Sequence, residues 1–574
     1  MKRKLIVLLA CLLAIAMVFS ACESAPGSSG SSDVSTETQE TSGSADSSPQ
    51  AEEVGENWVD DEVVHLKFWA MREDTVQDME TNAYIQWLEQ ECGVDIEFEQ
   101  ASSAEALQKL NLSLASGDYP DVYYSLQTIT DINTNIINST LMKYGEAGIF
   151  IPLNDLIDQY GENIGELLDS VDYLRNGITM PDGNIYSLPT YSEIYHCRYS
   201  QKMWIDQSWL DALDLEMPTT TDELYEVLKA FKEQDPNGNG EADEIPLAGC
   251  INGWHSDPYA FLMNAFIYDE GDKHFTVQDG QVDTILNKEE YREGLRYINK
   301  LYEEGLIYSE TYTQDATQLK SVASQDPNRV GAFTIGAPMA AVDGNAPLYK
   351  NIVTVPPLEG PEGVQYAGYY VYQDLRIGGY IITSACENPE AAFKLADFMY
   401  SDDASIRLRQ GEYGVDWRMA EEGEKTFDDR DAEYARITPL VTDGDAQNQH
   451  MGNTGLFQET NDSFIGLWAV ADDFDIRSLN GIEQLLIEQT APYEGYEPEE
   501  TLPPVVFTEE EASEITTIET EVKKYCDEQR TLFITGQRDL DTDWEDYINN
   551  LNNLGIDQLV EAYNTAYARQ YLHE

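Results

Sequence analysis

An acidic, glycine-containing segment at residues 235–246 carries the clearest chemistry in the sequence. Oxygen-bearing side chains occupy its first, third and fifth positions, and glycine occupies its sixth. This spacing matches the start of an EF-hand loop, in which a tight turn directs about six to eight hard oxygen atoms onto Ca²⁺. The segment therefore predicts a calcium site. Its predicted ligands are Asp235, Asn237, Asn239, the main-chain carbonyl of Glu241, Asp243 and Glu244.

The segment departs from the EF-hand pattern at its twelfth position, where Pro246 stands in place of the usual bidentate glutamate. Asp243 and Glu244 must then complete the coordination shell. The alternative is a polar turn after the helix that begins near Thr220. Three spaced donors and two glycines are more than a plain turn requires, which favours calcium.

No catalytic centre can be read from the sequence. It contains no HExxH, GxSxG or P-loop motif. Carboxylates are abundant, but the separation that a glycosidase pair needs is a property of the folded chain. His196 and His255 lie near loops, where a single histidine is more often a surface or core residue. Arg72 and Arg376 could pair with an acidic ligand, although an arginine on so acidic a chain usually has an internal partner.

The composition excludes several classes of partner. Asp and Glu number 106 against 34 Lys and Arg, which gives a formal net charge of −72. Non-specific nucleic-acid binding needs basic side chains that neutralise phosphates, so we expect no nucleic-acid partner. Docking to anionic lipid needs basic patches and is also disfavoured. A hydrophobic content of 42% with 11% aromatic residues indicates a large globular protein.

The N-terminus has the features of a lipoprotein signal peptide. Three basic residues precede an uncharged apolar run, and Phe19-Ser20-Ala21-Cys22 resembles a bacterial lipobox. Cleavage before Cys22 and acylation of that residue would anchor the chain in a membrane. An ordinary secretory signal with an incidental cysteine is the alternative. Residues 22–57 are rich in Ser, Gly and acids, which predicts a flexible tether.

The remaining cysteines are few and dispersed. Cys92, Cys197, Cys250, Cys386 and Cys526 form no CxxC pair and no clustered framework. We expect mostly free thiols, with one disulfide possible.

The folded part begins with alternating strands and helices. Residues 64–68 and 94–98 alternate apolar and polar side chains, as strands do, and residues 82–91 between them have a helical pattern. Another helical stretch at 104–114 precedes a third strand at 120–124. This alternation predicts a parallel α/β sheet. Further helices are expected from Thr220, from Asn388-Pro389 and around residues 556–563.

The order of these features resembles the bacterial extracellular solute-binding proteins of ABC importers. The resemblance lies in the lipobox, the tether, the first strand ending in Phe68-Trp69, and a series of segments that follow in family order. Those segments are ASGDYPD (115–121), DGNIYSLP (182–189), residues 389–400, GEYGVDW (411–417) and residues 531–546. The last two are similar to the large LipO-like subgroup, and the calcium segment resembles that of its alginate-oligosaccharide-binding members, where its role is structural.

The resemblance implies an α/β, two-lobed, periplasmic-binding-protein-like fold with a ligand cleft between the lobes. In open α/β sheets, ligands bind outside the carboxyl ends of the strands, and two facing lobes can close by a hinge. The expected units are a signal peptide at 1–21, an acylated tether at 22–57, one lobe from 58–188 plus 376–440, and another from 189–375 plus 441–574.

The resemblance and the tyrosine content (35 Tyr against 17 Phe) point to a carbohydrate, most simply an oligosaccharide. Sugar rings stack their apolar faces on aromatic planes. Each aromatic candidate could equally be a core residue. The candidate ligand residues are Trp69, Tyr124, Trp254, Tyr369 and Trp417.

The expected function is therefore that of a non-enzymatic, monomeric binding protein. It would be lipid-anchored at the extracellular face of the cytoplasmic membrane and would deliver its ligand to ABC permease subunits. The alternatives are a secreted glycoside hydrolase or lyase, a peptide-binding protein, and a sensor or adhesin lipoprotein.

Overall fold

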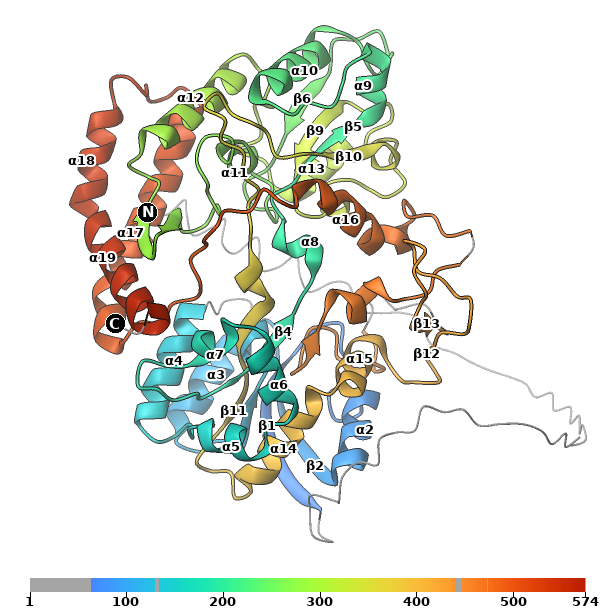
Figure 1. Cartoon of the computed structure of the whole chain (residues 1–574), viewed down its shortest axis with the longest axis vertical. Helices are drawn as coiled ribbons and strands as arrows, with labels where there is room; N and C mark the ends of the chain where they lie inside the picture. Colours follow the sequence, from blue (N-terminus) through green and yellow to red (C-terminus); the bar gives the residue numbers. More distant parts are fainter. Residues whose placement is uncertain (1–62, 130–133, 439–445, 472, 573–574) are drawn as a thin grey trace, which may run out of the picture. The chain divides into compact units, whose positions relative to one another are not determined.

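The computed structural model describes residues 63–129, 134–438, 446–471 and 473–572 (Figure 1). The expected signal peptide, the lipidation site Cys22 and the tether lie outside these residues. None of the described helices is both long and apolar enough to span a membrane. The five cysteines that the structure describes are all free thiols.

The first sheet has six strands in the order β14-β4-β11-β3-β1-β2. β1, β2 and β3 are parallel, as the alternation of strands and helices predicts, and β11 runs antiparallel to β3 and β4. The strands are β1 (Val64–Arg72), β2 (Val94–Ser102), β3 (Val122–Tyr124), β4 (Leu188–Ser192), β11 (Leu375–Ile382) and β14 (Gln458–Glu459).

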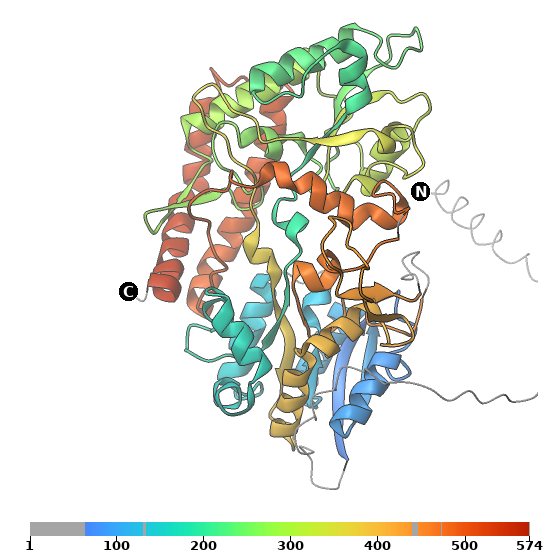
Figure 2. The same cartoon turned by 45° about the vertical axis from the view of Figure 1, so that its right-hand side comes forward.

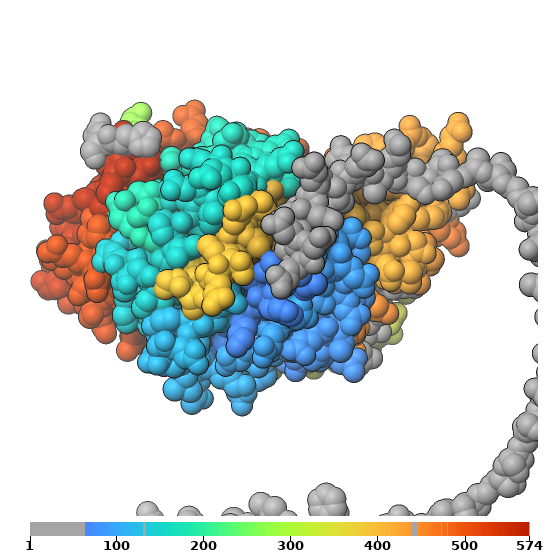
Figure 3. Space-filling view, turned by 90° about the horizontal axis from the view of Figure 1, so that it is seen from below, coloured from blue at the N-terminus to red at the C-terminus, as the bar shows by residue number. Residues whose placement is uncertain are grey.

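Helices cover this sheet and bury one apolar core. The predicted helix at 82–91 forms with Asn82 as its N-cap, whose side chain accepts a hydrogen bond from the Tyr84 amide. Seen from below, the blue N-terminal residues lie against the cyan residues that follow them and against a gold segment from much later in the chain (Figure 3). The helices are α2 (Ala83–Cys92), α3 (Ala106–Ser116), α4 (Thr134–Glu146), α5 (Asn154–Tyr160), α6 (Asn163–Ser170), α7 (Leu174–Ile178), α14 (Pro389–Met399) and α15 (Asp402–Gln410).

The second sheet has four strands in the order β10-β5-β9-β6, and only β6 and β9 are parallel neighbours. Its strands are β5 (Met203–Asp206), β6 (Ile245–Ala248), β9 (Val330–Thr334) and β10 (Ile352–Val355). Its helices are α8 (Tyr195–Arg198), α9 (Gln207–Leu213), α10 (Thr221–Glu233), α11 (Pro258–Met263), α12 (Glu289–Glu303), α13 (Ala316–Ala323), α16 (Ile482–Thr490), α17 (Glu509–Ile534), α18 (Trp544–Leu554) and α19 (Ile556–Tyr567).

Two small hairpins complete the described part. β7 (Phe275–Gln278) pairs with β8 (Gln281–Thr284) beside α19, and β12 (Trp417–Met419) pairs with β13 (Tyr434–Arg436). The second hairpin closes over a separate cluster of Ile406, Trp417 and Trp468.

The two sheets bury separate hydrophobic cores, which gives the molecule two α/β lobes. The chain first crosses between them from β4 through α8 to β5 (Figure 2). It returns through a short helical turn, Val371–Asp374, directly into β11.

Strand pairing shifts the expected lobe boundaries. β14 pairs with β4 through Gln458 and Tyr191, so the chain is still in the first sheet well after residue 441, where we expected the second lobe. β4 also extends past the expected boundary at 188. The physical reason is that β14 is only two residues long and carries no alternation that a sequence pattern could reveal. We therefore propose that the chain leaves the first lobe twice. It leaves first after β4 and finally after β14.

Candidate functional site

The 235–246 segment follows α10 and folds back on its first residue. Asp235 accepts hydrogen bonds from the amides of Asn239 (3.0 Å) and Gly240 (2.9 Å). Gly238 and Gly240 have φ values of 68° and 80°, which only glycine adopts without strain. The turn that an EF-hand start requires is thus built into the chain.

The acidic end of this segment contains one carboxylate oxygen that makes no hydrogen bond and could coordinate a cation. Oε1 of Glu244 is buried and has no hydrogen-bond partner among the described residues. Burial, then the charges of Asp243 and Asp235, raise the pKa of Glu244. Asp243 pairs with Arg329 at 2.7 Å. An orphaned carboxylate oxygen beside further oxygen donors suits Ca²⁺.

The described part of the structure nevertheless contains no group of three or more His, Cys, Asp or Glu side chains placed to hold a metal ion. Two of the six predicted ligands are amides and one is a main-chain carbonyl, so carboxylates supply only half of the set. The Asn239 amide donates to Asp243 at 3.0 Å, which holds the amide and carboxylate donors near one another. The residues fit a calcium ion by donor chemistry, and calcium remains a proposal.

A second site lies at the carboxyl ends of the parallel strands β6 and β9. The loop after β6 carries Trp254, whose side chain is 40% exposed. Gly336, the second residue after the end of β9, donates its amide to the Trp254 carbonyl at 2.9 Å. His196 of α8 meets the Trp254 ring edge-on, with ring centroids 6.5 Å apart. This is the edge of an α/β sheet at which ligands bind.

Beside Trp254 the loop borders a cavity of about 160 Å³. Polar and apolar groups both line it, and they come from the loop, from α11 and from α17. A drug-sized ligand usually occupies about 300–1,000 Å³, so this hollow has room for only part of an oligomeric ligand. The lining residues are Gln201, Cys250, Ile251, Gly253, His255, Ser256, Asp257, Tyr259, Ala260, Gly271 and Arg530.

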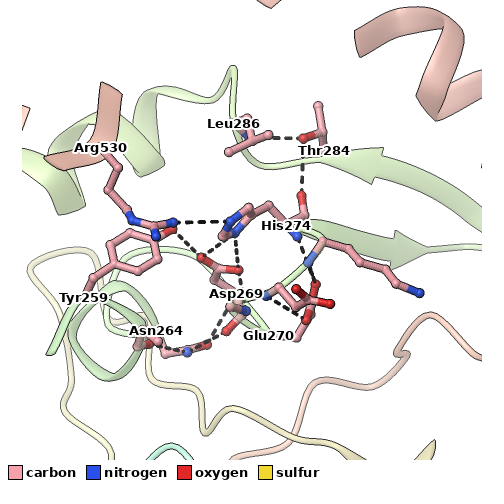
Figure 4. Close-up of polar contacts among 12 residues, drawn as sticks. Tyr259, Asn264, Asp269, Glu270, His274, Thr284, Leu286 and Arg530 are labelled. Atoms are coloured by element: carbon pink, nitrogen blue, oxygen red, sulfur yellow. Dashed lines mark hydrogen bonds and ion pairs between the residues drawn. The ribbon is translucent and has the colours of Figure 1, made fainter. Parts of the chain in front are cut away.

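A buried polar network holds two of these lining residues in place (Figure 4). The Tyr259 hydroxyl donates to Asp269, and His274 Nδ1 lies 2.9 Å from Asp269 Oδ1. Arg530 lies over the Tyr259 ring at 4.4 Å and within 3.4 Å of His274 Nε2. Burial alone would raise the pKa of Asp269, but the His274 charge and the hydrogen bonds to the carboxylate hold it below its usual value. The network is a rigid frame for the hollow.

A second set of contacts holds the polar side chains of His255 and Gln201, which also line the hollow. The His255 ring packs at a tilt against Tyr370, with ring centroids 4.8 Å apart, and Gln201 donates to the Tyr370 hydroxyl at 2.5 Å. Burial, and then the charge of Lys202, lower the pKa of His255 to about 4. His255 is therefore neutral near pH 7 and can donate or accept hydrogen bonds with a neutral hydroxyl.

The five aromatic candidates for ligand binding differ in how much of each side chain is exposed. Trp254 is exposed and lies between two residues that line the hollow, Gly253 and His255, and Tyr369 is half-buried against Tyr199 at 5.1 Å. Trp69 and Tyr124 have no exposed surface, because both lie in the first lobe's core. Trp417 is 3% exposed and donates its indole N–H to the Gly411 carbonyl at 2.9 Å.

Sequence reasoning missed several residues at this site. Gln201, Tyr259 and Arg530 lie far apart in the chain and belong to no motif, and Arg530 comes from a helix in the C-terminal quarter. The turn-rich composition around Trp254 and the neighbouring His255 marked the region in advance.

Comparison with known proteins identifies the family. The model of the bacterial extracellular solute-binding proteins matches residues 74–406. The chain belongs to this family. A member from Streptococcus pneumoniae serotype 4, described as the fructooligosaccharide ABC transporter substrate-binding protein FusA, is 30% identical over 502 residues, which cover 86% of this chain and 88% of FusA. Lipoprotein LipO of Bacillus subtilis is 30% identical over 237 residues, 40% of this chain and 42% of LipO.

A solved structure supports the same fold. The S. pneumoniae FusA EF-hand mutant in complex with fructo-nystose matches with a TM-score of 0.68 and 27% identity. The match covers 89% of this solute-binding chain and all of the FusA chain. The predicted family, its LipO-like character and the two-lobed α/β fold are thus confirmed.

Proposed function

We propose that this solute-binding protein is the substrate-binding subunit of an ABC importer and that its ligand is an oligosaccharide. The observation that carries the proposal is the exposed indole of Trp254 at the carboxyl edge of β6 and β9. An aromatic plane beside polar groups suits a sugar, which has apolar CH faces and hydroxyl edges. FusA, the relative that covers most of the chain, is described as a fructooligosaccharide-binding subunit.

Binding would use three kinds of contact. Trp254, with Tyr369 as a secondary candidate, supplies the stacking surface. His255 and Gln201 supply hydrogen bonds, and the frame around Asp269 prevents these groups from shifting. Pre-organised polar groups in a partly dry hollow favour affinity because little ordering entropy is lost on binding. Trp69, Tyr124 and Trp417 are not proposed as ligand residues, since none offers an accessible face.

The protein would bind its ligand without chemical conversion, as its relatives are described to do. A glycoside hydrolase or lyase remains the second candidate, and product analysis separates the two. Release of the ligand would require the lobes to separate at the crossings through α8 and β11. The permease would then receive the free sugar.

Calcium at residues 235–246 would stabilise the second lobe. The buried Oε1 of Glu244 supports this role, and a solved FusA variant is described as an EF-hand mutant. The loop lies away from the residues that line the hollow, so the ion would act on stability. Acylation of Cys22 and the tether would hold a monomeric protein at the extracellular membrane face.

A ligand screen tests the proposal. The protein from residue 23 onward is heated with fructo-oligosaccharides, other neutral and acidic oligosaccharides, monosaccharides and peptides. A ligand that binds only the folded state raises the melting temperature. Trp254→Ala should abolish the shift, and Leu112→Ala, at an exposed apolar residue of the first lobe, should leave it intact. Sugar fragments after incubation would favour the hydrolase, and a response to peptides alone would refute carbohydrate binding.

A further inference from the structure

Arg376 occupies an unusual place on the first sheet. It is the one exposed residue of β11, whose other residues are all buried. β11 runs antiparallel to β3 and β4, and Arg376 pairs with Thr190 near the carboxyl end of β4. The guanidinium therefore stands at the edge where the parallel strands β1, β3 and β4 end, which is the ligand edge of an α/β sheet.

The backbone is irregular just after this residue. The register of β11 against β4 shifts between Arg376 and Tyr380, and Gly378 in that interval has a φ of 97°. A bulge of this kind re-aims neighbouring side chains, and such bulges occur preferentially beside binding sites. A strand that otherwise faces the core thus presents a single long cation to solvent.

Arg376 has no partner in the described part of the protein. Every other arginine there makes at least one hydrogen bond or ion pair, including Arg72, Arg436 and Arg477, which bond to uncharged oxygen atoms. The two nearby carboxylates each pair with another arginine, although Oδ1 of Asp374 has no hydrogen-bond partner among the described residues. Asp374 pairs with Arg198 at 2.6 Å, and Glu459 pairs with Arg409 at 3.1 Å.

Charges of both signs surround Arg376, because Arg409 acts on it together with the carboxylates of Glu459 and Asp374. Burial, and then the charge of Arg409, lower the pKa of Arg376. The same guanidinium acts electrostatically on the Cys197 thiol of α8, and the adjacent His196 touches Trp254. Arg376 is therefore close to the element that borders the proposed sugar site.

We propose that Arg376 binds a carboxylate of the ligand, so that the oligosaccharide is acidic and contains uronic-acid units. This inference rests on the proposed function, whose site it extends to the first lobe. A planar guanidinium matches a planar carboxylate through two parallel N–H···O bonds. Asp374 and Glu459 pair with Arg198 and Arg409, so a ligand carboxylate need displace no ion pair of Arg376.

The test compares each sugar acid with its neutral methyl ester. The probes are trisaccharides of galacturonate, mannuronate and guluronate, with kestose as a neutral reference, and affinities are measured by calorimetry at low salt. A hydrogen-bonded charge pair corresponds to roughly ten- to hundredfold in affinity, so at least one acid should bind that much more tightly than its ester. Arg376→Gln should remove the difference and leave the ester's affinity unchanged, and Arg376→Lys should retain part of it.

Two controls keep the result specific. Arg175→Gln removes an exposed guanidinium that pairs with Asp169 and should change no affinity. The melting temperature of ligand-free Arg376→Gln should lie close to the parent's, because the Arg376 side chain makes no hydrogen bond or ion pair in the described part of the protein. Equal binding of acid and ester, or an unchanged preference in Arg376→Gln, would overturn the inference. Tight binding of kestose alone would overturn the inference of an acidic ligand but leave the proposed function standing. No response to any saccharide would refute the proposed function itself.

Discussion

The indole of Trp254 packs directly on Gly336, so closely that a Cβ atom at residue 336 would lie 2.4 Å from Cε3 of the ring. The glycine follows β9 and the tryptophan follows β6, and the two strands are parallel neighbours. The exposed aromatic face is therefore set by a glycine more than 80 positions away in the chain. Any side chain at residue 336 must displace the ring.

Gly336→Ala should weaken sugar binding while the protein still folds. Overpacking of this kind costs about 1–3 kcal/mol, and here it falls on a loop residue that can move outward. Calorimetric affinity and urea unfolding would separate the two effects. Gly165→Ala in α6 is the matched control, since a Cβ there meets no atom within 4 Å and alanine favours a helix. Unchanged affinity in Gly336→Ala would show that the ring position does not matter.

Glu244→Gln should reduce the stabilisation that calcium provides. The substitution keeps the shape but removes a carboxylate whose Oε1 has no partner. Because a buried carboxylate oxygen without a partner is costly, the variant without metal should be at least as stable as the parent. Melting curves with Ca²⁺ and with chelator measure both quantities. An undiminished calcium response would exclude Glu244 from the coordination shell, and no response in the parent would remove the site.

The stability of the protein should fall on acidification in a way that depends on His255. Its pKa is about 4 in the folded protein, against the ordinary value near 6.5 that applies after unfolding. The unfolded chain thus binds the proton first, so stability is lost as the pH falls from about 6.5 to about 4. The free energy of unfolding of His255→Gln should decline less over this range. His65→Gln, at an exposed histidine outside the hollow, should follow the parent. A parent-like slope in His255→Gln would contradict the assignment.

Asp269→Asn should destabilise the second lobe strongly. The carboxylate is fully buried and is bonded by Tyr259 and His274, and loss of a buried charged partner costs about 3–5 kcal/mol. Urea unfolding measures the change. Asp283→Asn removes an exposed ion pair with Lys288 and should cost no more than about 1 kcal/mol. Similar costs for the two variants would show that the network in Figure 4 does not frame the hollow.

Local signals in the sequence predicted the elements well where one face of an element is buried. The alternation at Val64 to Phe68 marks β1, and the helical spacing after Thr220 marks α10, whose N-cap forms as predicted. The tight turn at Asp235 is also local, because its glycines and its first carboxylate lie within six residues. These features follow from backbone sterics and short-range hydrogen bonds, which neighbouring residues largely decide.

Long-range packing decided the rest. Trp69 and Trp254 are the same residue type, yet one lies wholly in a core and the other is 40% exposed, since burial depends on what distant segments place against a ring. β14 joins the first sheet through two residues, and Arg376 lacks a partner because Asp374 and Glu459 are engaged elsewhere. The sequence by itself determined the family, the acidic surface and the oxygen-rich loop. The tertiary structure alone decided which aromatic rings are exposed and which arginine has no ion-pair partner. Both depend on contacts between residues far apart in the chain.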